Sequence, residues 1–415
     1  MTAIHALRKK SSSRNMSIVQ TLVLYYRLFF YYLYSGNGID TYYSTEIDRR
    51  ILIHIYSLAL VIRLFSFPHY RAKCYGDDLR ANLHNVIVPF TGIPLSIFCF
   101  NKYVCLFFLI FIYPLWAFIG SIYLSFRDSR KKTAHEHFYE QLLRPNHWFA
   151  TWRINCTIVA YHSYKKWEQT EEQYAMEDKG RFLIEANKLD IPVTPILDVP
   201  CIMIKHKSIE GGMGINIYDN FATNHGDWII QKVFSNSDFI QRLVTPDAPL
   251  STVRIITSRD SSSSSSPIKV KTMVFRAGRI RQKTDHNAIF YDIDFNSSHR
   301  LSSGTTNCHW YQSGFKSFDT KSMWNEQNYS VHPDSHERIE GIKWPNVNEM
   351  IQCVCQAHEK LCPNVPIIGW DVAWTNEDNQ LMLLELNISC NFFNGHFDTE
   401  EYTKFCYEWF HALDI

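Results

Sequence analysis

At 415 residues, the chain is long enough for two or three domains. Its 42 Lys and Arg residues nearly balance its 41 Asp and Glu residues, so the formal net charge of +1 gives no sign of a nucleic-acid partner. The eleven cysteines include no CxxC pair, which disfavours a zinc site and indicates reduced thiols in a cytosol-type compartment.

The chain begins with a basic segment that contains no Asp or Glu through residue 39. An apolar, tyrosine-rich run follows at 18–34, and a second apolar run lies at 51–67. A basic, acid-free start fits an organellar transit peptide, a signal anchor or an amphipathic surface helix, and the sequence does not separate these three. Because charged and polar residues interrupt the second run, we expect it to lie at a membrane interface or against a partner. Residues 1–85 are therefore predicted to be a helical or targeting region.

The most apolar stretch of the chain is 103–126, which carries no charge. A helix needs about 20 apolar residues to cross a bilayer. Arg127 and three further basic residues follow, and the positive-inside bias places this flank and the rest of the chain in the cytoplasm. We therefore predict a membrane segment over 86–132, with the alternatives of a buried core helix or, together with 86–100, a re-entrant hairpin.

Residues 133–178 are predicted to be a helical linker and the front of a soluble domain. The sequon at Asn155 matters only in a lumen, which the predicted topology disfavours. A helix with an apolar stripe is predicted over 173–189, and Lys179 lies near its start. By its position alone, this lysine fits an ordinary solvated helix residue.

Residues 200–205 are predicted to form a short buried strand that ends in Lys205. Gly211, Gly212 and Gly214 follow it, and glycines let backbone N–H groups approach an anion without interference from Cβ. The pattern is neither a Walker loop nor a Rossmann fingerprint, and it fits a phosphate flap or a glycine-rich hairpin.

Further strands are predicted at 227–233, 251–258 and 268–275, the last two joined by a run of six serines. Arg254 stands in the middle of a β-branched strand, where a guanidinium is costly unless it is paired. Its partner is either a phosphate or carboxylate of a substrate, which suits its planar fork, or a structural carboxylate.

Residues 369–390 predict two strands around a polar turn, preceded by an amphipathic helix at 347–361 and followed by a helix at 400–413. With an odd number of loop residues, Asp371 lies directly opposite Glu385.

Strand alternation predicts that Leu381, Leu383, Glu385 and Asn387 share one face of the second strand. A divalent cation turns the repulsion between two facing carboxylates into attraction, and a dense set of oxygen ligands suits Mg²⁺. The alternative is a surface hairpin whose charges lie in solvent.

These motifs, in this order, resemble the ATP-grasp superfamily over about 179–415. Asp371 followed by Glu385-Leu386-Asn387 resembles the closing metal motif of that superfamily, and GWDVAWT…LMLLELN looks like its sugar-transfer-associated group. The resemblance implies an α+β fold for this catalytic domain, in which two α+β lobes grip the nucleotide, preceded here by a helical, partly membrane-embedded N-terminal region.

The resemblance also implies a role for each candidate residue. It gives Lys179 and Lys205 to the phosphates of ATP, the glycine loop to the triphosphate, and the backbone of Gln231 and Lys232 to adenine. It further implies that one or two Mg²⁺ ions are held by Asp371, Glu385 and Asn387, and that Asn287 approaches the nucleotide–substrate junction. In the mechanism that follows, we expect Arg254 to orient the acceptor.

The implied activity is an ATP- and Mg²⁺-dependent ligation, in which a carboxylate becomes an acyl phosphate that an amine or similar nucleophile attacks. The association with sugar transfer implies a saccharide or lipid-linked glycan as substrate, at a membrane, by analogy. The alternatives are a kinase of a hydroxyl acceptor, such as an inositol phosphate or a sugar, and a non-catalytic nucleotide-binding membrane scaffold.

Overall fold

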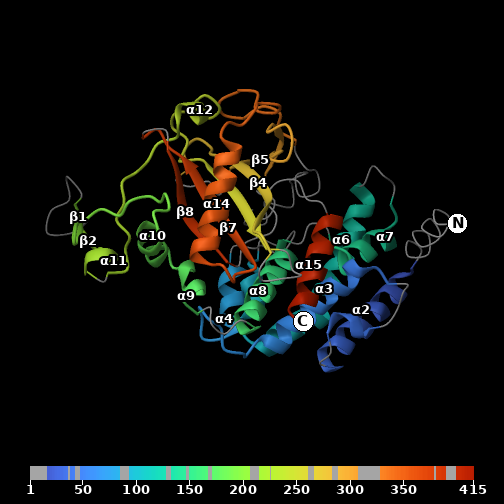
Figure 1. Ribbon diagram of the computed structural model, residues 1–415. Coiled ribbons are helices and arrows are strands. Elements are labelled where there is room, and N and C mark those ends of the chain that lie inside the picture. The colour runs from blue at the N-terminus through green and yellow to red at the C-terminus, as the bar shows by residue number, and fades with distance from the viewer. Residues whose placement is uncertain are drawn as a thin grey trace. The chain divides into compact units, whose positions relative to one another are not determined.

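The protein is described by a computed structural model that divides into two compact units (Figure 1). Unit 1 comprises Met1–Lys166, Trp310–Thr320 and Phe397–Ile415, and unit 2 comprises Trp167–His309 and Lys321–His396. The residues that the structure describes are 16–35, 38–42, 47–84, 93–127, 132–145, 149–166, 171–205, 215–224, 226–259, 266–282, 288–306, 328–377, 380–388 and 399–415. The domain limits predicted from the sequence stay predictions, because compact units need not coincide with domains.

The described part of unit 1 is helical, as predicted for the N-terminal region. Its helices are α2 (Ile18–Ser35), α3 (Arg49–Leu64), α4 (Tyr75–Asn82), α5 (Lys102–Phe107), α6 (Tyr113–Arg127), α7 (Ala134–Leu143), α8 (Phe149–Lys166) and α15 (Thr399–Ala412). Shorter turns are η2 (Ile39–Thr41), η3 (Leu95–Cys99) and the π-helical η4 (Phe108–Ile112), which joins α5 to α6.

The centre of unit 1 is α3, which is buried along almost its whole length. Two of its polar side chains are hydrogen-bonded in the core: His54 Nε2 lies 2.9 Å from the hydroxyl of Tyr113, and Ser57 donates to Asn155 Oδ1 at 2.5 Å. The prediction that the apolar run at 51–67 lies at a membrane interface or against a partner is therefore wrong. It is the interior helix of unit 1.

The sequon asparagine also belongs to this core. Asn155 has no exposed surface, and its amide nitrogen donates to the hydroxyl of Tyr402 in α15 at 2.7 Å. A glycan on Asn155 would have to break this network, so the sequon is not a modification site in the folded chain.

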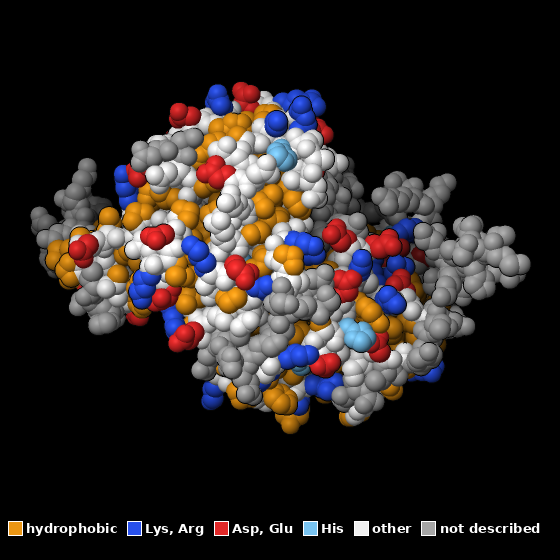
Figure 2. All heavy atoms as spheres, viewed as in Figure 1, with side chains coloured by type: hydrophobic (Ala, Val, Ile, Leu, Met, Phe, Trp, Pro, Cys, Tyr) orange, Lys and Arg blue, Asp and Glu red, His pale blue; other side chains and the backbone are white. Residues whose placement is uncertain are grey.

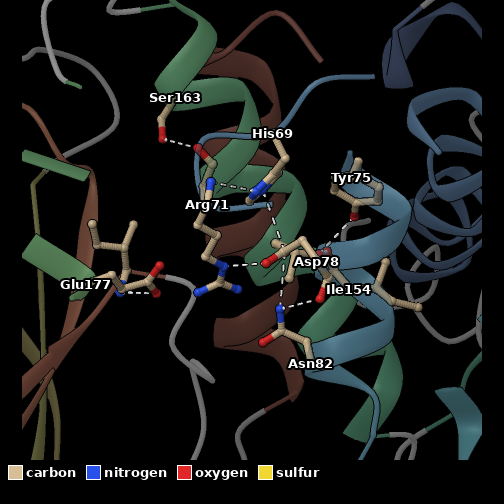
Figure 3. Close-up of polar contacts among 11 residues, drawn as sticks. His69, Arg71, Tyr75, Asp78, Asn82, Ile154, Ser163 and Glu177 are labelled. Atoms are coloured by element: carbon tan, nitrogen blue, oxygen red, sulfur yellow. Dashed lines mark hydrogen bonds and ion pairs between the residues drawn. The ribbon is translucent and has the colours of Figure 1, made fainter. Parts of the chain in front are cut away.

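A buried carboxylate fixes α4 (Figure 3). Asp78 accepts from the guanidinium of Arg71 and, at 3.1 Å, from the amide of Asn82, while His69 Nε2 lies 3.6 Å away. Tyr75, on the same helix, shares a 2.9 Å hydrogen bond with Thr157 of α8. Because Asp78 is held by neighbouring side chains and Tyr75 by Thr157, we assign this cluster a structural role.

Among the described residues, one helix, Lys102–Phe126, is long and apolar enough to cross a membrane, and 44% of its most apolar window is buried. A core helix passes the same criterion of length and composition, so the predicted crossing stays a prediction.

Unit 2 is built on a six-stranded antiparallel sheet in the order β6-β5-β4-β3-β7-β8, with a separate two-stranded sheet of β1 and β2. The strands are β1 (Cys201–Lys205), β2 (Ile215–Asp219), β3 (Thr252–Ser258), β4 (Lys269–Ala277), β5 (Ile289–Ile293), β6 (Leu301–Thr306), β7 (Ile367–Trp374) and β8 (Leu381–Asn387). The helices are α9 (Glu171–Tyr174), η6 (Ala175–Glu177), α10 (Lys179–Lys188), α11 (Phe221–Asn224), α12 (Asp238–Gln241) and α14 (Val347–Leu361). The predicted mixed α+β class is confirmed, while the gripping of a nucleotide by two lobes stays a prediction.

The two faces of the large sheet differ. On one face, Trp370 of β7 packs against Phe182 of α10 and His358 of α14, with ring centroids 6.3 and 6.4 Å apart, and its indole N–H donates to Thr257 at 2.8 Å. The other face carries the charged side chains described below. The sheet is therefore amphipathic, with its apolar face under two helices.

Two strand predictions are wrong in detail. The strand β1 is not buried, because Met203 and Ile204 are both more than half exposed. The segment 227–233 is not a strand, and makes only isolated bridges at Trp228 and Gln231.

Acidic and basic side chains are mixed on the face of the molecule that Figure 2 shows, in keeping with the near-zero net charge.

Candidate functional site

The hairpin of β7 and β8 places two carboxylates directly opposite each other. Asp371 pairs with Glu385 in the ladder, as the sequence predicts. The register shifts at the next residue of β7, because Val372 pairs with Leu383 rather than with Leu384. Leu384 is therefore an extra residue in β8, which makes a β-bulge. The predicted sharing of one face by Leu381, Leu383, Glu385 and Asn387 is therefore wrong for the two leucines. The bulge turns Leu383 toward the apolar face and leaves Glu385 and Asn387 on the charged one.

Asp371 is the buried centre of the site. Arg254, its direct neighbour on β3, donates Nε to Oδ1 at 2.5 Å and Nη2 to Oδ2 at 2.9 Å. Arg276 on β4 adds a longer contact, with Nη1 3.4 Å from Oδ1. Burial raises the pKa of Asp371, but the two guanidinium groups outweigh it and lower the pKa to about 2. The carboxylate is thus ionised, and it fixes both arginines.

Glu385 lies at the partly exposed end of the site. Lys179, the first residue of α10, places Nζ 2.6 Å from Glu385 Oε2, and the amide of Asn387 donates to Oε1 at 3.2 Å. The start of α10 is fixed nearby, because Glu177 accepts a hydrogen bond from the backbone of Ile388, the residue after β8, at 3.0 Å. The fold therefore brings Lys179 to the predicted metal ligands although about 200 residues separate them in the chain.

Four neighbouring strands thus carry a line of charged side chains on one face, which we call the polar row: Arg276, Arg254, Asp371 and Glu385. Asp292 of β5, paired with Val274 opposite Arg254, adds a third carboxylate to this face, so that with Lys179 three cations balance three anions. The guanidinium groups are fixed, partly desolvated donors, which suit an anion such as a phosphate.

The oxygen donors at this end fit Mg²⁺. Glu385 and Asn387 supply a carboxylate and an amide oxygen, and Asp371 supplies a second carboxylate, which is the hard donor set that this ion prefers. Both oxygens of Asp371 are engaged by Arg254, so Glu385 and Asn387 are the more accessible ligands. In the described ranges, no group of three or more His, Cys, Asp or Glu side chains is arranged so that it could hold a metal ion.

The predicted adenine segment is tied into the fold. The side-chain amide of Gln231 donates to the hydroxyl and carbonyl oxygens of Thr194, at 2.7 and 3.1 Å. Lys232 forms an ion pair with Glu377. Both side chains are therefore occupied structurally, which leaves any adenine contact to the backbone, as the resemblance implies.

Several predicted residues lie outside what the structure describes. Gly211, Gly212, Gly214 and Asn287 fall in undescribed segments. For Lys205 the backbone is described, paired with Ile215 of β2, and the side chain is not. Their predicted roles stay predictions.

Sequence reasoning missed Arg276, because the predicted strand ends at residue 275. The strand β4 continues to Ala277, and its pairing of Arg276 with Thr252 puts the side chain on the face of Arg254. The available signal was the alternation along β4, in which Val274 and Arg276 share a face.

Comparison with known proteins agrees with the sequence motifs. Residues 217–394 match the family described as sugar-transfer associated ATP-grasp, which confirms the resemblance over that segment. No curated protein matches the chain. A solved structure that matches is N5-carboxyaminoimidazole ribonucleotide synthetase from Thermotoga maritima, with 11% identity over 51% of this chain. The match spans 41% of that chain, and its TM-score of 0.22 does not establish a shared fold.

Proposed function

We propose that this chain, whose residues 217–394 match the sugar-transfer associated ATP-grasp family, is an ATP-dependent enzyme that uses the polar row to bind the nucleotide. More specifically, we propose a ligase that converts a carboxylate into an acyl phosphate for attack by an amine or a similar nucleophile. The observation that carries the proposal is the fixed arrangement of Arg254, Asp371 and Glu385 on adjacent strands.

The arginines are held ready before any ligand arrives. Arg254 is buried, and its bidentate contact to Asp371 fixes the plane of its guanidinium. Donors that need no rearrangement stabilise developing negative charge at little cost, and they act more strongly where water is excluded. Arg254, assisted by Arg276, is therefore proposed to orient the anionic acceptor or the transferred phosphoryl group.

Lys179 has a different role, because its side chain is exposed and can exchange partners. Its Nζ now neutralises Glu385, a proposed ligand of Mg²⁺ together with Asn387 and Asp371. When bound, Mg²⁺ supplies positive charge to the nucleotide phosphates. A cation held by Glu385 would compete with Lys179 for the same carboxylate, and Lys179 would then be able to pair with a phosphate.

The chemistry needs no nucleophile from the protein. A carboxylate oxygen of the acceptor attacks the γ-phosphorus of ATP, the bond to the bridging oxygen breaks, and ADP leaves. The amine then attacks the acyl carbon, loses a proton, and displaces inorganic phosphate. Positioning and electrostatics are the contributions of the chain.

The remaining roles belong to the same proposal. Lys205 and the loop of Gly211, Gly212 and Gly214 are assigned to the triphosphate, and Asn287 to the junction with the acceptor. The description of the matched family and the long apolar helix in unit 1 support a saccharide or lipid-linked glycan as substrate, at a membrane, with unit 2 in the cytoplasm.

The test is a screen of the purified full-length chain with ATP, Mg²⁺ and pooled amines and carboxylates. A ligase releases inorganic phosphate only when both acceptors are present. ADP formed together with a stable phosphorylated alcohol would instead identify a kinase. Tight binding of ATP without any turnover across the screen would identify a scaffold, and either result would overturn the ligase.

A further inference from the structure

The helix Lys102–Phe126 has two unlike sides along its whole length. One side is buried in unit 1, and the other carries seven large apolar side chains, each of them exposed. These residues follow one another at intervals of four, four, four, four, three and four, which is one face of a helix, and we call them the outer stripe: Tyr103, Phe107, Phe111, Leu115, Ile119, Ile122 and Phe126. At about 1.5 Å per residue, the stripe is longer than a bilayer core is thick.

The buried side is attached to the rest of unit 1 by polar contacts. The hydroxyls of Tyr25 and Tyr26 in α2 donate to the carbonyls of Leu109 and Ile110, at 2.9 and 2.6 Å, where the π-helical turn η4 disturbs the backbone pairing. Tyr113 donates to carbonyls at the end of α7. The helix is therefore one wall of a helical unit rather than a separate rod.

A helix that crossed the bilayer would carry its neighbour α7 with it. This neighbour lies beside α6, with the rings of Phe118 and Phe138 6.0 Å apart, and it contains Glu136 and Glu140. Acidic side chains in the hydrocarbon region are costly. With the stripe lying flat on the membrane instead, α7 stays on the protein side.

The charges of this part of the chain suit an anionic lipid surface. No Asp or Glu occurs in residues 1–39, which include α2, or in residues 79–127, which include the outer stripe, whereas basic residues occur in both. On α2, Val19 and Val23 are exposed and lie on the face of Tyr26, the side that contacts the helix of the stripe. Exposed apolar side chains on segments that carry basic and no acidic residues suit the surface of a membrane with anionic lipids.

We propose that unit 1 binds a membrane containing anionic lipids through the outer stripe, with the helix parallel to the membrane plane and both of its ends on the cytoplasmic side. This inference specifies the membrane association proposed above and does not depend on the ATP chemistry. The chain is monotopic, and the helix does not cross.

The first experiment is flotation of the full-length chain, without nucleotide, on vesicles of phosphatidylcholine with and without phosphatidylserine. We expect binding to both, stronger with phosphatidylserine. Leu115→Glu should weaken it about tenfold or more, because an acidic side chain is strongly disfavoured in the apolar phase. The matched control is Leu189→Glu, an exposed leucine of unit 2, which should leave binding unchanged. Thermal unfolding checks that both variants fold.

Equal flotation of the two variants would overturn the proposal. So would a full-length chain that forms stable dimers lost in Leu115→Glu, since a second copy would then cover the stripe. The phosphate-release assay, run on the same preparations without vesicles, reports the proposed function separately.

A second measurement distinguishes lying flat from crossing. Sites for a specific protease are inserted on each side of the helix, between His84 and Ile93 and between Arg127 and Lys132. With protease outside sealed vesicles, cutting at both sites supports the in-plane placement. Protection of one site until detergent is added contradicts it.

Discussion

The two units differ in where they place polar and apolar side chains. Unit 1 buries polar side chains in closed pairs, such as Asn155 with Tyr402, and leaves apolar side chains exposed along one helix. Unit 2 buries the apolar face of its sheet under α10 and α14 and holds charged side chains on the other face. The difference indicates different partners: an apolar phase for the exposed helix of unit 1, and a charged ligand for the sheet of unit 2.

The largest expected effect comes from removing one charge from the polar row. Glu385→Gln keeps the shape of the side chain but removes the proposed metal ligand and the partner of Lys179. We expect ATP turnover to fall on the order of 10²-fold or more. Turnover by the purified variant measures it, with the unfolding midpoint as a check on the fold.

The matched control is Glu377→Gln, on the turn of the same hairpin, where Glu377 pairs with Lys232. This variant should keep most of the activity. Equal loss in both variants would show that the hairpin matters for structure and not through Glu385.

The second effect concerns stability. Replacing Arg254 by Met leaves the buried charge of Asp371 with only the longer contact to Arg276, which should lower the free energy of unfolding by about 3–5 kcal/mol. Urea denaturation measures the change.

A partly exposed ion pair gives the comparison. Arg279 binds Asp334 through two nitrogens but is 30% exposed, so Arg279→Met should cost about 1 kcal/mol. Similar losses of unfolding free energy in the two variants would mean that Asp371 is not in a desolvated environment.

The third effect concerns the buried histidines of both units. Burial lowers the pKa of His54 to about 3 and of His162 to about 4 in unit 1, and it lowers the pKa of His358 to about 3 and that of His332 in unit 2. These imidazoles stay neutral in the folded chain while the unfolded chain takes up protons below about pH 6.5, so stability falls as pH decreases, by up to about 1.4 kcal/mol per pH unit for each histidine.

Asp371 does not contribute to the pH dependence of stability between pH 7 and pH 5. Its lowered pKa contributes stability that is complete above about pH 4 and is lost only as pH falls toward 2. Urea denaturation at pH 7 and pH 5 therefore reports the histidines. His54→Gln combined with His162→Gln should flatten the pH dependence more than His358→Gln, and the reverse order would contradict the assignment of two such groups to unit 1.

The smallest effect is expected between β3 and β4. Of the six serines that join these strands, 261–265 lie outside the described residues, and deleting three of these shortens the connection without touching either strand. The free energy of unfolding should change by less than about 1 kcal/mol, because closure entropy varies slowly with loop length. A loss of several kcal/mol would assign the serines a specific role.

Much of unit 2 was predictable from local patterns. Alternation and turn residues predicted the hairpin and the facing of Asp371 and Glu385, and helical spacing predicted α14. The bulge at Leu384 was not predictable, since one extra residue in a run of leucines leaves no mark in the sequence. The same holds for the partner of Lys179, which depends on how α10 packs at the edge of the sheet.

In unit 1, too, part of the structure could not be predicted from the sequence. The spacing of the residues in the outer stripe can be read from the sequence. Which side of the helix is buried depends on its packing against α2 and α7. The pairing of Asn155 with Tyr402 joins residues from opposite ends of the chain and has no local signal.

The central claim is that a nucleotide and its metal bind at the end of the polar row. The most direct measurement is binding of Mn²⁺, followed by its electron paramagnetic resonance signal, in the presence of ATP. We predict ATP-dependent binding in the wild-type chain and in Glu377→Gln, and its loss in Glu385→Gln. The same binding in all three proteins would place the metal elsewhere and contradict the account.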